Sequence, residues 1–264
     1  MPFLSSVEGT FAFGKPGPVS TFQVATSNLQ IWVDAGNNAS YPGSGTKWSN
    51  LVAANAGTYW YTLVNGPYQS NVVYNNTSNN AISFDGGNFY AINNTSLSNL
   101  ATSGSWNETR EYWVFWRGTP GCLVSENGTI TPDTAWFDAQ TSFSNTNVYA
   151  SVWQGGLTPY TTATGFSSNT WNHVVWQWNN STTTMLMYVN GIQTFSINIG
   201  ARQLPTSLGY GYYMALCSRS GTNFLRGSES NLNCCLGVFR WYNRLLTSNQ
   251  VWDNYNAERS RFGR

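Results

Sequence analysis

Charged side chains are scarce in this sequence, and their scarcity excludes several classes of protein. Lys and Arg number 12 and Asp and Glu number 11, so 9% of the 264 residues are charged, against roughly 25% in an ordinary soluble domain. The formal net charge of +1 leaves no broad basic surface for nucleic acid and no acidic tail. Coiled coils and long helical bundles are excluded by the same composition.

Long apolar runs are also missing. No stretch of 18 apolar residues occurs, so the sequence predicts no bilayer span and no membrane partner. The N-terminal residues contain neither a basic segment nor an apolar segment after it. We therefore expect no secretory signal, and synthesis in a reducing cytoplasm.

Cysteine and histidine are too few for a zinc site. The four cysteines show no Cys-x-x-Cys spacing, and His173 is the single histidine. We expect the cysteines to be buried thiols, with a disulfide as the open alternative. Cys234 and Cys235 are adjacent in a predicted strand, so they should point to opposite faces of the sheet. The other two cysteines are Cys122 and Cys217.

Aromatic residues are abundant, at 16% of the chain, and many fall in short alternating runs typical of strands. In the run Glu111–Arg117, Tyr112 and Trp116 share one face while Trp113 and Phe115 share the other. Both faces are apolar, which predicts a central strand of a sandwich. The predicted strands are Leu29–Asp34, Ala81–Asp85, Asn88–Ile92, Glu111–Arg117, Trp171–Trp178, Met185–Val189, Ile192–Asn198 and Cys234–Tyr242.

Two turns and one helix have clear signals. Asn190-Gly191 predicts a hairpin, because a type I′ turn needs positive φ at both central residues. Gly86-Gly87 predicts a turn between two further strands. A helix is expected to begin after Thr247 as N-cap, with Gln250 completing a capping box, and to end near Ala257. Leu246 and Val251 occupy the hydrophobic staple positions, and the helix should pack Val251, Trp252 and Tyr255 over a sheet edge.

The chain divides into an extended N-terminal arm, residues 1–27, and one all-β domain, residues 28–264. The arm contains several Gly and Pro residues, which interrupt regular secondary structure, and aromatic residues that we expect to be exposed. One interpretation is a disordered tail. The other is an anchor that inserts Phe3, Phe11 and Phe13 into a partner.

Four blocks of sequence, in order, resemble one known fold family. They are Leu29–Leu51 with its Ser-Tyr-Pro-Gly-Ser-Gly-Thr run, Ile82–Tyr90 with Phe-Asp-Gly, Trp171–Val175 with Met187–Gly191, and Gly237–Gly263 with Tyr-Asn-Arg and Asn-Tyr-Asn-Ala. Together they are similar to the concanavalin A-like jelly roll, in the laminin-G-like branch found in structural proteins of large DNA viruses and phages. The resemblance implies a jelly-roll β-sandwich with one short C-terminal helix.

The resemblance also implies a function. The expected protein is a non-enzymatic virion component, such as a minor capsid, decoration or appendage protein, anchored by its arm to other virion proteins. A homo-oligomer stays open. The alternative is a carbohydrate-binding module for host attachment, with glycans as partners. Its candidate residues are Trp136, Trp153 and Tyr160, which lie in polar, Gly-rich stretches; the competing interpretation places these rings in the core.

A glycoside hydrolase is the remote alternative, because this chemistry needs two carboxylates flanking the scissile bond. Glu108 and Glu111 are three positions apart in a strand, so they should point to opposite faces. Asp133 and Asp138, five apart, fail for the same reason, although either pair could still meet in a loop. We expect no catalytic residue, and we expect His173 to be structural, hydrogen-bonded between strands.

Calcium is the one cofactor that stays open, with Asp34, Asp85, Asp133 and Asp138 as its candidate ligands. Asp34 and Asp85 read equally well as turn residues that bond local backbone. The last 25 residues contain five arginines. They predict either a solvated tail that complements the helix dipole or a docking surface for an acidic partner. These are Arg240, Arg244, Arg259, Arg261 and Arg264.

Overall fold

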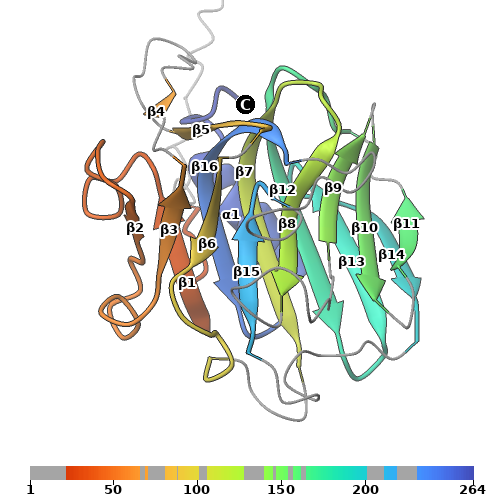
Figure 1. Cartoon of the computed structure of the whole chain (residues 1–264). Coiled ribbons are helices and arrows are strands. Elements are labelled where there is room, and N and C mark those ends of the chain that lie inside the picture. The colour runs from red at the N-terminus through yellow and green to blue at the C-terminus, as the bar shows by residue number, and fades with distance from the viewer. Residues whose placement is uncertain are drawn as a thin grey trace, which may run out of the picture.

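Two antiparallel β-sheets stack face to face, and one helix covers the outside of one of them (Figure 1). The computed structural model describes residues 22–65, 69–70, 81–87, 89–100, 106–127, 140–144, 147–153, 157–161, 165–200, 211–218 and 231–264. Within these ranges all paired strands are antiparallel. The one parallel pairing there is an isolated bridge between Cys122 and Asn231. The predicted all-β sandwich is confirmed.

Sheet A carries the helix. Its order is β14 (Ile192–Asn198), β13 (Thr184–Val189), β12 (Trp171–Asn179), β7 (Glu108–Trp116), β16 (Asn233–Tyr242), β5 (Ala81–Asp85) and β4 (Gln69–Ser70). The long strand β16 pairs with β5 through its first half and with β1 (Leu29–Asp34) through its second half. β7 is therefore central, between β12 and β16, as predicted from its two apolar faces.

Sheet B forms the front layer in Figure 1. Its order is β11 (Leu157–Thr161), β10 (Asn147–Trp153), β9 (Gln140–Ser144), β8 (Gly121–Asn127), β15 (Tyr213–Leu216), β6 (Tyr90–Asn93), β3 (Trp60–Val64) and β2 (Lys47–Ser49). Apart from β6, none of these strands has a clear sequence signal. Gly86-Gly87 does not close a hairpin, because β5 before it belongs to sheet A and β6 after it belongs to sheet B.

The main core lies between the sheets and is rich in aromatic rings. In β7, Tyr112, Val114 and Trp116 face this core, whereas Trp113 faces the helix side. Tyr112 stacks on Phe239 of β16 at a ring-centroid distance of 5.3 Å. Burial of each such ring stabilises the fold by about 1.5–3 kcal/mol. The abundant aromatic residues thus form a core on both faces of sheet A.

The hairpin β13–β14 turns through Asn190 and Gly191, whose φ values are 52° and 81°. Both lie in the left-handed region that a type I′ turn requires. A Cβ on Gly191 would lie 2.7 Å from Cε3 of Trp252, so the turn also packs against the helix. The hairpin predicted from Asn-Gly is confirmed, and its turn contacts the helix.

The helix α1 (Ser248–Glu258) begins at the predicted N-cap. Thr247 accepts from the backbone N–H of Gln250, and the Gln250 side chain accepts from the Thr247 N–H, which is the expected capping box. Val251 and Tyr255 are buried against sheet A, but Trp252 is 42% exposed. The expectation that Trp252 packs over the sheet is therefore wrong in part. Its position is rotated by about 100° from Val251 on the helix, so its ring lies on the flank.

The three arm residues Phe3, Phe11 and Phe13, together with Trp136, Asp133 and Asp138, lie outside the described residues. Their proposed roles stay predictions. Among the described residues, no helix is long and apolar enough to cross a membrane.

Candidate functional site

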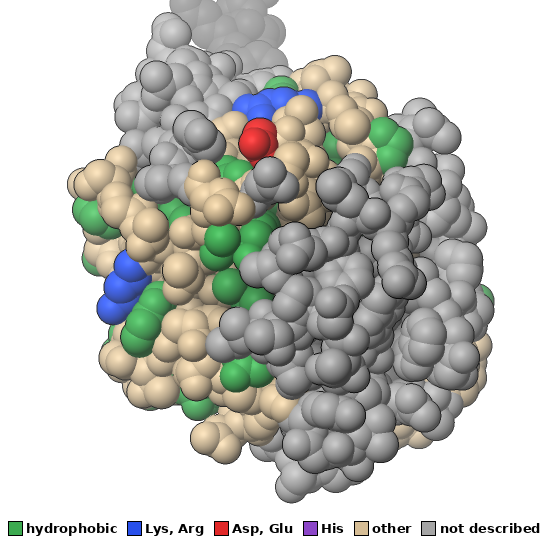
Figure 2. Space-filling view, in the orientation of Figure 1, with side chains coloured by type: hydrophobic (Ala, Val, Ile, Leu, Met, Phe, Trp, Pro, Cys, Tyr) green, Lys and Arg blue, Asp and Glu red, His purple; other side chains and the backbone are tan. Residues whose placement is uncertain are grey.

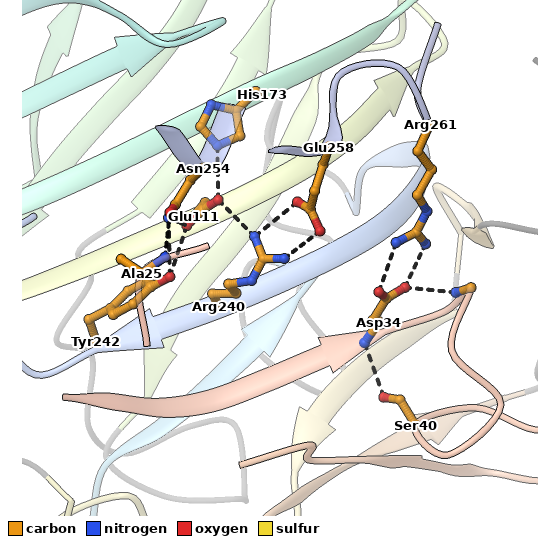
Figure 3. A network of polar contacts seen from close by, with 11 residues as sticks. Ala25, Asp34, Ser40, Glu111, His173, Arg240, Tyr242, Asn254, Glu258 and Arg261 are labelled. Carbon is orange, nitrogen blue, oxygen red and sulfur yellow. Dashed lines mark hydrogen bonds and ion pairs between the residues drawn. The ribbon is translucent and has the colours of Figure 1, made fainter. Parts of the chain in front are cut away.

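A cluster of buried charged groups lies between sheet A and α1 (Figure 3). At its centre is Glu111 of β7, whose Oε1 accepts from Nη1 of Arg240 at 2.8 Å and contacts Nε2 of His173 at 3.0 Å. Its Oε2 accepts from Nδ2 of Asn254 at 2.7 Å and from the hydroxyl of Tyr242 at 3.2 Å. Four partners on three elements besides β7 therefore hold one carboxylate, and the residue is fully buried.

Electrostatics keep this carboxylate ionised. Burial alone would raise the pKa of the Glu111 carboxyl, but the charge of Arg240 and the hydrogen bonds from His173 and Asn254 outweigh it and lower the pKa to about 2. Burial also opposes the charge of Arg240, but Glu258 and Glu111 raise the pKa of its guanidinium above the usual value. The cluster is a buried ion network.

Arg240 joins the network to the helix. Its Nη2 and Nη1 donate to the two carboxylate oxygens of Glu258 at 2.5 and 3.0 Å, a bidentate geometry that fixes the last turn of α1. The guanidinium also lies 4.8 Å from the ring centroid of Trp32 in β1. Asn254 accepts from the backbone N–H of Ala25 at 2.7 Å, so the segment before β1 is tied to the same helix.

A second buried ion cluster joins the two sheets through the main core. Arg110 of β7 donates to Glu108 at 2.9 Å and to Glu126 of β8. Tyr212, which precedes β15, donates its hydroxyl to Glu126 at 2.7 Å. Trp241 Nε1 donates to Glu108 at 2.9 Å. Glu108, Arg110 and Glu126 are fully buried, so the cluster is a polar link between sheets A and B.

These contacts determine what the carboxylates can do chemically. Glu108 faces the interior and Glu111 faces the helix, as the alternation of β7 predicts, so the two cannot flank one sugar. Both are buried and each is paired with an arginine, whereas a glycosidase needs two carboxylates on either side of a bound substrate. The arrangement holds the fold together and offers no general acid or base to solvent.

His173 takes the structural role predicted for it. The ring lies on β12 and contacts Glu111 of the neighbouring strand β7 through Nε2, while Nδ1 has no hydrogen-bond partner among the described residues. A proton on Nε2 therefore satisfies Glu111. Trp113 and Tyr255 lie against the ring, with centroids 5.1 and 5.7 Å away.

The described calcium candidates have other partners. Asp34 forms a bidentate ion pair with Arg261, at 2.7 and 2.5 Å, and accepts from the backbone N–H of Gly36. Asp85 accepts from the N–H of Gly87 at 2.8 Å, which is an Asx-turn. No group of three or more His, Cys, Asp or Glu residues suited to a metal gathers within the described ranges. Calcium stays an untested prediction.

The carbohydrate candidates that fall in described backbone lie at one edge of sheet B. Trp153 ends β10 and pairs with Leu157, whereas Tyr160 of the edge strand β11 pairs with Ala150. Positions 150 and 153 are three apart, and successive positions of a strand alternate between faces. The register therefore assigns positions 153 and 160 to opposite faces of the sheet, and their role in sugar binding stays a prediction.

Four of the five C-terminal arginines form contacts with other parts of the chain. The prediction of a solvated tail or docking surface is wrong for Arg240, which is fully buried, whereas Arg264 is exposed and does not contradict it. Arg240 and Arg261 form the ion pairs described above. Arg244 donates to the carbonyl of Ser27, and Arg264 donates to the carbonyl of Trp171. The sequence alone did not reveal these partners, because, apart from Glu258 at 18 positions from Arg240, they lie about 90 to 230 positions away along the chain.

Sequence reasoning also missed the partners within both ion clusters. A usable signal existed, because Arg240 sits in a strand that is mostly apolar and aromatic, and Glu111 directly precedes the apolar run of β7. A charge in a doubly covered strand must find a partner. Which residue supplies that partner depends on strand register and helix placement.

The described surface carries few charges. Figure 2 shows the face of sheet B, where uncharged polar and hydrophobic side chains dominate the described area and charged ones are scattered. The most exposed large apolar side chain among the described residues is Ile192, at 63%, which follows Gly191 in the chain. Recognition on such a surface would depend on amides, hydroxyls and rings more than on charge.

Comparison with known proteins gives the fold and no family. No protein-family model and no curated sequence matches the chain. Among solved structures, the binding domain of Paraclostridial Mosquitocidal Protein 1 superposes with a TM-score of 0.61 at 16% identity, covering 88% of this chain and 52% of that one. The receptor-binding domain of a botulinum neurotoxin mosaic of serotypes C and D gives 0.60 at 12% identity, covering 88% and 51%.

A Trypanosoma rangeli sialidase is similar over 90% of this chain, with a TM-score of 0.59 and 12% identity, but over only 34% of its own length. The chain thus spans about half of the matched toxin domains and a third of the sialidase. A further similar structure belongs to botulinum neurotoxin type C, which depends on interaction with two ganglioside molecules to enter cells. At these identities the likeness shows a shared β-sandwich fold.

Proposed function

We propose that this chain is a lectin-like module that binds carbohydrate and has no catalytic activity. The observation that supports it best is the use of the carboxylates: Asp34, Glu108, Glu111, Glu126 and Glu258 are all buried in ion pairs with arginine. Among the described acidic residues only Asp85 and Asp253 lie outside these ion pairs, so ligand recognition by the described part of the chain would rest mainly on rings, amides and hydroxyls. Sialidase and toxin domains of the same fold, one of them from a toxin that uses gangliosides, support carbohydrate as the ligand class.

The proposed binding edge is the β10–β11 end of sheet B. Trp153 ends β10 and pairs with Leu157, the first residue of β11, in a stretch rich in Gly and polar residues. An indole offers an apolar face and one N–H donor, which suits the mixed surface of a sugar ring. Tyr160 belongs to the opposite face by register, so Trp153 is the residue to test first.

Replacement of Trp153 by Ala should weaken glycan binding by about ten-fold or more, which corresponds to about 1.4 kcal/mol. The measurement is a screen on a glycan array and on ganglioside-containing vesicles, followed by titration of the best ligand. Trp153→Phe is the matched control and should retain part of the affinity, because a ring remains. Equal binding by Trp153→Ala, with its thermal transition unchanged, would contradict this site, and no binding by the wild-type chain to any glycan would contradict the function.

The second candidate is a role in a virus particle. It is favoured by the four sequence blocks that resemble viral structural proteins and by the weakly charged surface, which suits close packing against neighbours. In this proposal the arm, residues 1–27, anchors the module to other virion proteins through Phe3, Phe11 and Phe13.

Deletion of residues 2–20 should leave the sandwich folded and abolish incorporation into particles. Quantitative mass spectrometry of purified particles gives the readout, and circular dichroism of the truncated protein gives the folding control. Tens to hundreds of copies of the full chain per particle would fit a capsid component, and a handful would fit a vertex, tail or fibre. Normal incorporation of the truncated chain would exclude the anchor, and absence of the full chain from particles would exclude the virion role.

A further inference from the structure

Two of the four cysteines contact each other across the core. The thiols of Cys217 and Cys234 are 3.3 Å apart, and both residues are fully buried. Cys217 directly follows β15 of sheet B, whereas Cys234 is the second residue of β16 in sheet A. The contact therefore bridges the two layers of the sandwich, between residues 17 positions apart in sequence.

The other two cysteines are directed to other partners. Cys122 donates to the carbonyl of Val124 at 3.1 Å. Cys235 faces the helix side of sheet A, as its adjacency to Cys234 predicts, and its sulfur accepts from Nη2 of Arg117 at 3.1 Å. The structure thus distinguishes one sulfur–sulfur contact from two cysteines that can serve as controls.

The backbone at Cys217 is held in an unusual conformation. Its φ of 59° lies in the left-handed region, which is unfavourable for a residue with a side chain. Two hydrogen bonds fix it there: its N–H donates to the carbonyl of Leu123 at 2.6 Å, and its carbonyl accepts from the N–H of Leu232 at 3.2 Å. The constrained turn presents the Cys217 thiol to Cys234.

We propose that Cys217 and Cys234 form a redox-convertible pair, which joins sheets A and B by a disulfide when a small-molecule disulfide such as oxidised glutathione is present. The thiolate of one cysteine attacks the glutathione disulfide, forming a mixed disulfide and releasing one glutathione thiolate. The second cysteine, as thiolate, attacks the mixed disulfide, the Cys217–Cys234 bond forms and a second glutathione thiolate leaves. The protein loses two protons and two electrons, and one glutathione disulfide is reduced to two glutathiones.

Burial controls how readily the pair reacts. The sulfur atoms need to approach from 3.3 Å to about 2.05 Å, a small movement. Burial and the neighbouring thiols raise the pKa of Cys217 well above its usual value, so few thiolates exist in the closed fold. We therefore expect slow oxidation of the native chain and faster oxidation when the chain refolds in a glutathione redox buffer.

The test is a peptide map of the full chain after incubation, native or during refolding, in oxidised and reduced glutathione. Trypsin cleaves after Arg219 and Arg226, which separates Cys217 in peptide 203–219 from Cys234 in peptide 227–240. We expect these two peptides to be linked after refolding, and the number of thiols that iodoacetamide alkylates to fall from four to two. The apparent Tm should rise by about 5 °C or more and return to its starting value with dithiothreitol.

Single variants assign the bond. Cys217→Ala and Cys234→Ala should abolish the linked peptide, whereas Cys122→Ala and Cys235→Ala should retain it. The Cys235 variant also resolves which of two adjacent cysteines is linked. The wild-type map alone shows whether peptides 203–219 and 227–240 are linked, so this result does not depend on the folding of any variant. Four alkylated thiols after refolding, or a bond to Cys122 or Cys235, would overturn the proposal.

Discussion

Replacement of Arg110 by Met should cost at least about 3–5 kcal/mol of unfolding free energy, because removal of one partner leaves buried charges uncompensated. Arg110 is fully buried, and it is the cation shared by Glu108 and Glu126. Met fills a similar volume, so lost packing contributes little. A stability of 5–15 kcal/mol is typical of a domain, so the variant should be unfolded or close to unfolding at 37 °C. Urea titration followed by tryptophan fluorescence is the measurement.

Two further variants isolate the charge effect. Arg117→Met is the control at the other end of β7, because among the described residues Arg117 contacts Asn233, Ser83 and Cys235 but no carboxylate. It should cost only about 1–2 kcal/mol. The triple variant Arg110→Met with Glu108→Gln and Glu126→Gln should recover much of the loss, since no charge is left buried alone. An Arg110→Met protein within 1 kcal/mol of the wild type would show that the cluster is not a stabilising link.

Lowering the pH should reduce the free energy of unfolding by a comparable amount, because Glu111 then becomes protonated. Its pKa falls from 4.5 in the unfolded chain to about 2 in the fold, which corresponds to about 3 kcal/mol. Because the folded pKa is the lower one, the unfolded state takes up the proton first as the pH falls. The contribution is therefore complete above about pH 5, declines below it and is lost as the pH drops through about 2. Urea titrations at pH 7, 4 and 2.5 measure the decline.

Glu111→Gln tests the assignment. The variant should be less stable than the wild type at pH 7, because Arg240 loses one of its two carboxylate partners. Its free energy of unfolding should also fall less steeply between pH 5 and 2. Asp253→Asn is the control on α1, because Asp253 takes part in none of the network contacts described here, and it should keep the wild-type slope. Parallel pH profiles for the wild type and Glu111→Gln would contradict the role of this carboxylate.

Local patterns predicted those parts of the fold that depend on neighbours in sequence. The Asn190-Gly191 turn and the Thr247 capping box are set by backbone conformation and by hydrogen bonds over three residues. The alternation in β7 separated Glu108 from Glu111 correctly, because the faces of a strand follow from its geometry alone. The burial of all four cysteines also follows from residue type.

Strands without alternation were not predictable in the same way. β8, β9, β10 and β11 carry Gly, Ser, Asn and Thr at many positions, and their pairing is set by neighbours in sheet B. The turn at Gly86-Gly87 looked like a hairpin because the signal for a reversal is local. Whether the next strand stays in the same sheet or crosses to the other depends on long-range packing.

By itself, the sequence determined the class of the molecule: an aromatic-rich, weakly charged chain that folds as an all-β sandwich with one capped helix. Only the tertiary structure decided which charges meet. Arg240 finds Glu111 through the register of β16 on β7 and finds Glu258 through the docking of α1, and Cys217 finds Cys234 across two sheets. Hydrophobic patterning is read from residues a few positions apart. The partners of a buried ion or thiol are chosen by distances in space, which the order of residues along the chain does not specify.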